Sequence, residues 1–135
     1  GRLPTEDEWE AAAGFSLGGG ETADGDLRLT DARKFANGFR QSGPDRYEGL
    51  APSGSFDSLK GTMDLFGNAA EMTRTTWPKE PDCSGELEKC VVNTRVAVKG
   101  GSYLSSESSF RISSRGFLDV SKGMGLVGFR CVREQ

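Results

Sequence analysis

The chain of 135 residues contains no histidine. This absence excludes Ser-His-Asp catalysis, an imidazole general base and any zinc, copper or iron site that needs a histidine ligand. No apolar run approaches the roughly 18 residues that a membrane-spanning helix requires. The net charge is −3, and the 17 basic residues form no long run. The sequence therefore predicts no nucleic-acid partner and no membrane insertion by this chain.

Cysteine is also scarce, with three residues and no Cys-X-X-Cys spacing. Cys83 and Cys90 bracket a polar loop, and two interpretations stay open: a small disulfide ring or two ordinary thiols. The disulfide would indicate an oxidising compartment, and we expect an extracytoplasmic location, in the periplasm or at the cell surface. Cys131 lies in the segment GFRCV, which predicts a buried thiol that packs as a small hydrophobic residue.

The composition is poor in apolar residues (35%) and rich in glycine (19 residues). The glycines follow no fixed period, which excludes collagen, and the aromatic residues spread along the chain argue against disorder. A chain of this length forms one domain with a modest core. We expect this domain to be built from loops, turns and short strands.

One helix is predicted, in the opening segment LPTEDEWEAAAGF. Thr5 is the predicted N-cap, Glu8 follows three residues later as its capping-box partner, and Gly14 together with the three glycines at 18–20 is expected to end the helix. Its buried stripe would consist of Trp9, Ala12 and Ala13. Strands are predicted where the pattern favours alternation, in AAEMTRTTW (69–77), in RVAV (95–98) and in the last core strand (126–133).

Three ordered segments carry a resemblance to a known family: GRLPTEDEWEAAA at 1–13, DLFGNAAEM at 64–72, and VKGGSY with RISSRGF and GFRCV near the end. They resemble RLPTEAEWE, GNVWEW and RGGSW…R…R…GFR of the formylglycine-generating-enzyme (sulfatase-modifying-factor) domain. The resemblance implies an α+β fold, a loop-rich variant of the C-type-lectin fold with short antiparallel strands and little helix. It also implies that residues 1–135 are the C-terminal two thirds of one such domain, whose N-terminal remainder would be a partner of this chain.

Two calcium sites follow from the resemblance. Asp64 and Glu71 flank a Gly-Asn turn, and calcium favours such a mixture of carboxylates and backbone carbonyls. The family's ligands fall on Asp64, Gly67, Ala69 and Glu71, and a surface turn with two solvated acids is the alternative. A second, weaker site would use Asn37, Gly38, Asp45 and Tyr47, although Asn37-Gly38 is also explained as a turn. We expect one or two calcium ions.

The family's catalytic chemistry uses copper(I) held by two cysteine thiolates, which follow the GGS[WY] motif. These positions are Ser105 and Phe110 here, and no cysteine occurs between residues 91 and 130. A hydroxyl does not replace the soft thiolate that copper(I) requires. We therefore expect a non-catalytic member without copper. The alternatives are a copper-dependent formylglycine-generating oxidase and a purely structural accessory domain.

A serine-rich segment stands where the active site would have been. Short hydroxyls around an aromatic residue suit adaptable recognition of a protein or other macromolecule. The predicted ligand-binding residues are Ser105, Ser106, Ser108, Ser109, Phe110 and Phe117. A solvated loop without a partner is one alternative, and a Phe110 side chain buried in the core is another. Arg111 and Arg115 are expected to make structural hydrogen bonds.

Overall fold

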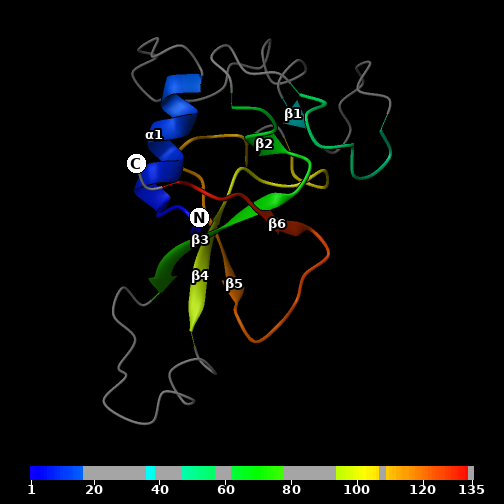
Figure 1. The fold of residues 1–135 in the computed structure, drawn as a ribbon. Helices are drawn as coiled ribbons and strands as arrows, with labels where there is room; N and C mark the ends of the chain where they lie inside the picture. Colours follow the sequence, from blue (N-terminus) through cyan, green and yellow to red (C-terminus); the bar gives the residue numbers. More distant parts are fainter. Residues whose placement is uncertain (17–35, 39–46, 57–61, 78–93, 107–108, 134–135) are drawn as a thin grey trace, which may run out of the picture.

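The computed structural model describes residues 1–16, 36–38, 47–56, 62–77, 94–106 and 109–133 (Figure 1). These ranges contain one helix and six short strands. In chain order they are α1 (Glu6–Ser16), β1 (Ala36–Asn37), β2 (Phe66–Gly67), β3 (Ala70–Trp77), β4 (Arg95–Lys99), β5 (Gly116–Asp119) and β6 (Val127–Phe129). Within the described ranges, no helix has the length and apolar character needed to cross a membrane.

The strands form two sheets. Four of them lie in the order β5-β4-β3-β6, and β1 and β2 form a separate parallel pair. The β3–β4 and β4–β5 pairs are antiparallel, as predicted, whereas β6 runs parallel to β3. The register of β3 against β4 shifts between Met72 and Thr76, which marks a bulge or irregularity in the strand. The α+β architecture with short strands and little helix is confirmed.

Helix α1 begins with the predicted capping box. The Glu8 amide donates to Thr5 Oγ1 (3.1 Å), and the Thr5 amide donates to Glu8 Oε2 (2.7 Å). The helix continues through Gly14 and ends at Ser16, before the three glycines at 18–20. A single glycine costs a helix only about 1 kcal/mol relative to alanine, so the helix passes through this position.

The core lies between α1, strand β2 and the segment after β4. Its buried members are Trp9, Ala13, Leu65, Phe66 and Phe110. The Trp9 and Phe66 rings meet edge to face with centroids 5.7 Å apart, an arrangement that aromatic quadrupoles favour. Gly100 closes this core: its φ is +84°, and a Cβ there would overlap the carbonyl oxygen of Leu65. The position therefore requires glycine.

The predicted burial of Cys131 is wrong, because its free thiol is exposed. After β6 the chain stays extended, and Val132 forms an antiparallel bridge with Arg2. Residues 130 and 132 are half-buried, whereas residues 129, 131 and 133 are exposed. Side chains alternate between the two faces of an extended segment, so Cys131 points outward together with Phe129.

Candidate functional site

Two cavities and one buried charge network contain the polar side chains of interest. The first cavity, here the Asp64 cavity, has a volume of about 620 Å³ and is lined among others by Ala51, Asp64, Ala69, Glu71, Phe129 and Arg130. The second, here the serine cavity, has a volume of about 460 Å³ and is lined among others by Val98, Ser102, Ser105, Ser109, Ser114 and Arg115.

A tight turn builds one wall of the Asp64 cavity. Asp64, Gly67 and Asn68 all have positive φ values, of 56°, 70° and 61°. Such values are uncommon for residues other than glycine and are tolerated best by Asp and Asn. The Asp64 carboxylate accepts hydrogen bonds from the amides of Gly54 and Phe56. These bonds hold segment 54–56 against the turn.

Glu71 also lines this cavity and is only 7% exposed. Its Oε2 accepts hydrogen bonds from Trp9 Nε1 (2.6 Å) and Arg130 Nε (2.5 Å). Arg130 Nη2 donates to the other carboxylate oxygen and to the Met63 carbonyl (3.0 Å). It also lies 3.4 Å from the Asp64 carbonyl. The buried charge of Glu71 is thus balanced by a bidentate guanidinium, the strong form of this ion pair.

The donor set of the first predicted calcium site is partly assembled. Asp64, Ala69 and Glu71 line the same cavity, while Gly67 lies in β2 and is buried. Carboxylate and carbonyl oxygens are the ligands that calcium takes, so the residues fit a cation. Of the predicted ligands, the Arg130 guanidinium binds the Glu71 carboxylate and lies 3.4 Å from the Asp64 carbonyl, while the Asp64 carboxylate is bonded to the amides of Gly54 and Phe56. In the described part of the chain, no three His, Cys, Asp or Glu residues cluster as metal ligands do.

The second predicted calcium site is described only in part. The backbone of Asn37 lies beside Gly67 in the β1–β2 pair, and Gly38 is buried against the ring of Phe110. Tyr47 is exposed and meets Phe56 edge to face at 6.2 Å. Asp45 lies outside the described residues. This partial description leaves the second calcium site a prediction.

The predicted serine-rich face is brought together only in part. Ser105 and Ser109 line the serine cavity, Ser106 is exposed, and Ser108 lies outside the described residues. The serines of the cavity include two that the sequence analysis did not assign to this face, Ser102 and Ser114.

Neither of the two aromatic residues predicted for this face lines the serine cavity. Phe110 is 1% exposed and belongs to the core, so its assignment as an exposed anchor is wrong. Phe117 is exposed on β5, where its ring lies 5.6 Å from that of Trp77. An apolar ring gains more from burial beside Trp9 and Phe66 than from an exposed loop, which explains the position of Phe110.

The positions of the family's two catalytic cysteines lie close together. A Cβ at Gly101 would be 3.1 Å from Ser105 Oγ and 3.2 Å from Phe110 Cε1. The Ser105 hydroxyl accepts a hydrogen bond from the Ser102 amide (2.9 Å). On the other side, a Cβ at Gly38 would overlap the Phe110 ring. A hydroxyl and a phenyl ring therefore fill the space in which the resemblance places two sulfurs.

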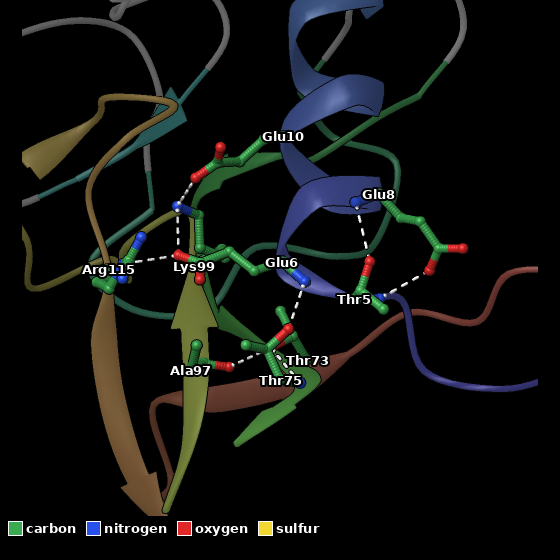
Figure 2. A network of polar contacts seen from close by, with 9 residues as sticks. All are labelled: Thr5, Glu6, Glu8, Glu10, Thr73, Thr75, Ala97, Lys99 and Arg115. Atoms are coloured by element: carbon green, nitrogen blue, oxygen red, sulfur yellow. Dashed lines mark hydrogen bonds and ion pairs between the residues drawn. The ribbon is translucent and has the colours of Figure 1, made fainter. Parts of the chain in front are cut away.

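A charge network joins α1 to the sheet (Figure 2). Lys99, at the end of β4, is fully buried and donates to Glu10 (2.6 Å) and Glu6 (3.3 Å). Arg115 Nε binds the same Glu6 oxygen at 2.7 Å, which confirms a structural role for Arg115. The Lys99 ammonium also lies 5.7 Å from the Trp9 ring centroid. The sequence analysis did not identify Lys99, and its place directly before the Gly-Gly turn was the available signal.

Comparison with known proteins adds independent findings. The family model described as "Sulfatase-modifying factor enzyme 1-like domain" matches residues 1–135. A formylglycine-generating enzyme from Mycobacterium tuberculosis is 29% identical over 98% of this chain and 51% of its own length. The chain thus spans about half the length of the curated relatives that it matches.

Solved structures agree with this fold. The structure of PvdO from Pseudomonas aeruginosa matches 95% of this chain and 50% of its own, with a TM-score of 0.68 and 22% identity. Treponema denticola variable protein 1 matches 95% of this chain and 45% of its own, with a TM-score of 0.66 and 22% identity. Identities this low bear on the fold alone.

Proposed function

Because the chain belongs to the sulfatase-modifying factor enzyme 1-like domain family, we propose that it is a non-catalytic member of that family. In this proposal the domain binds a protein or other macromolecule at the serine cavity, and calcium stabilises it. The observation that carries the proposal is the pair Ser105 and Phe110. They occupy the positions that the family resemblance assigns to the copper-binding cysteines, and neither side chain supplies a thiolate.

The absence of oxidase chemistry is tested by copper(I) titration and by oxygen uptake with a cysteine-containing sulfatase peptide. The Mycobacterium tuberculosis relative serves as the positive control. We expect neither stoichiometric copper(I) binding at this position nor oxygen uptake above the rate of free copper. Formylglycine formation by this chain would overturn the proposal in favour of the oxidase.

The chemistry of the serine cavity supports recognition of a peptide segment. The lining includes four serines and Arg115, whose side chain is 47% exposed, and Val98, Leu126 and Val127 supply apolar walls. An extended peptide presents both carbonyl acceptors and apolar side chains, which such a lining would satisfy. We therefore expect the partner to insert a short peptide segment here.

This binding is tested with a displayed library of random peptides. We expect wild-type protein to enrich a consensus sequence and Ser109→Trp, which fills the cavity, to lose it. Ser53→Trp is the matched control, because Ser53 is a serine in the lining of the other cavity. A purely structural accessory domain would enrich no consensus, and equal loss in both variants would also contradict the assignment.

For calcium, the proposed ligands are Asp64, Gly67, Ala69 and Glu71. Two carboxylates are few for a calcium site, so we expect weak affinity, in the range of extracellular modules (roughly 10⁻⁴–10⁻³ M). Such affinity suits an extracytoplasmic location. Calcium would stabilise the fold by linkage, so Tm should rise with calcium and fall with chelator. Glu71→Gln should remove most of this response.

A further inference from the structure

Arg130 brings a positive charge into the Asp64 cavity. Its guanidinium binds both carboxylate oxygens of Glu71 and the carbonyl of Met63, and lies within reach of the carbonyl of Asp64. Two carboxylate and two carbonyl oxygens therefore gather around one positive group. This is the type of oxygen set that a hard divalent ion also takes.

We propose that Arg130 is the built-in cation of this site and competes with calcium for Glu71. The inference rests on the proposed calcium site but makes a separate claim about a residue outside the predicted ligands. Trp9 Nε1 shares the Oε2 acceptor of Glu71 with Arg130 Nε, so three donor atoms already use this carboxylate. A calcium ion reaches Glu71 only when the guanidinium moves away. The calcium affinity of the wild-type chain is set by this exchange.

The test measures calcium affinity with and without the guanidinium. Trp77→Phe leaves Trp9 as the remaining tryptophan, since the chain has two, and its indole donates directly to Glu71. In this background, calcium chloride is titrated against Arg130→Gln by calorimetry and by Trp9 emission. We expect binding about tenfold tighter than in the parent, because removing a positive charge beside the site removes a repulsion of this order. Arg133→Gln, a change at an exposed arginine three residues away, is the matched control and should leave the affinity unchanged.

Each outcome decides the proposal. Unchanged or weaker calcium binding in Arg130→Gln overturns the competition, even where the wild type binds calcium as proposed above. Binding that occurs only in Arg130→Gln supports competition and overturns calcium stabilisation of the wild type. An absence of binding in both overturns both proposals. Should Arg130→Gln not fold, Arg130→Met replaces it: methionine also removes the positive charge beside Glu71, so tighter binding than in the parent is expected again. Adding Glu71→Gln to either variant should remove the gain.

Discussion

Glu71 and Lys99 are directly opposite each other in the β3–β4 register, yet their charges are balanced by different partners. Glu71 accepts hydrogen bonds from Trp9 and Arg130, whereas Lys99 donates hydrogen bonds to Glu6 and Glu10. Both side chains thus tie helix α1 to the sheet, one through a buried acid and the other through a buried base. Because directly opposed residues of an antiparallel pair share a face and both side chains contact α1, the proposed ion site and the charge network lie on the same face of the sheet.

The charge network predicts that Lys99→Met destabilises the fold. The substitution leaves Glu10 without its ammonium and Glu6 with Arg115 alone, and an incompletely balanced buried charge costs about 3–5 kcal/mol. The measurement is the free energy of unfolding in urea. Lys122→Met is the control: its side chain is 78% exposed and lies 3.8 Å from Asp119, so we expect a loss below about 0.5 kcal/mol. Equal effects in the two variants would contradict a structural role for the network.

The burial of Phe110 predicts a large effect of truncation. Phe110→Ala should lower the free energy of unfolding by about 3–5 kcal/mol, because it opens a cavity beside Trp9 and Phe66. Phe117→Ala should cost clearly less, since the Phe117 side chain is 42% exposed. Chemical denaturation of both variants provides the comparison. A small loss in Phe110→Ala would restore the interpretation of this residue as an exposed anchor.

The capping box predicts a dependence of stability on acid. The pKa of Glu8 is lowered from its ordinary value of 4.5 to about 2, mainly by hydrogen bonds from Arg2 and then from the Thr5 amide. A carboxyl whose pKa falls on folding stabilises the native state above its unfolded pKa and loses this effect as the pH drops through the folded value. The Tm of the wild type should therefore exceed that of Glu8→Gln at pH 6, and the gap should close between about pH 4.5 and 2.

The measurement for Glu8 is a series of thermal melts from pH 7 to pH 2. Asp7→Asn removes an exposed acid from the same helical turn and serves as the control for a general charge effect. A gap between wild type and Glu8→Gln that persists unchanged at pH 2 would show that the carboxylate of Glu8 does not act as the charged cap.

The outward position of Cys131 predicts an accessible thiol in the folded protein. In a Cys83→Ser, Cys90→Ser background, we expect one equivalent of thiol to react with a disulfide reagent without denaturant. The rate should approach that of a small free thiol. Protection of the thiol until the chain unfolds would support the buried position that the sequence analysis predicted.

The sequence predicted most reliably what short-range chemistry determines. The Thr5–Glu8 capping box and the strands around Glu71 and Val96 follow from spacing within a few residues, and all are present. Asp64 and Glu71, which the resemblance assigned to one site, line the same cavity. These features need no knowledge of distant parts of the chain.

The remaining features depend on contacts between distant residues. Arg130 reaches Glu71 over 59 positions and Lys99 reaches Glu6 over 93, and neither partner is encoded by a local pattern. Phe110 was ambiguous for the same reason: a phenylalanine in a serine-rich segment fits a surface anchor or a core side chain equally well. The glycines at positions 38 and 101, which admit its ring, lie far apart in the sequence.

The bridge between Arg2 and Val132 has a consequence for the speed of folding. Its two hydrogen bonds, of 3.1 and 2.8 Å, join positions near opposite ends of the chain, and β3 pairs with β6 across more than 50 residues. Such contacts contribute little to stability until the intervening chain has been ordered, because closing a long loop first costs conformational entropy. Domains dominated by long-range pairings fold in milliseconds to seconds. We expect this bridge to form late, with the local α1 and β3–β4 contacts preceding it.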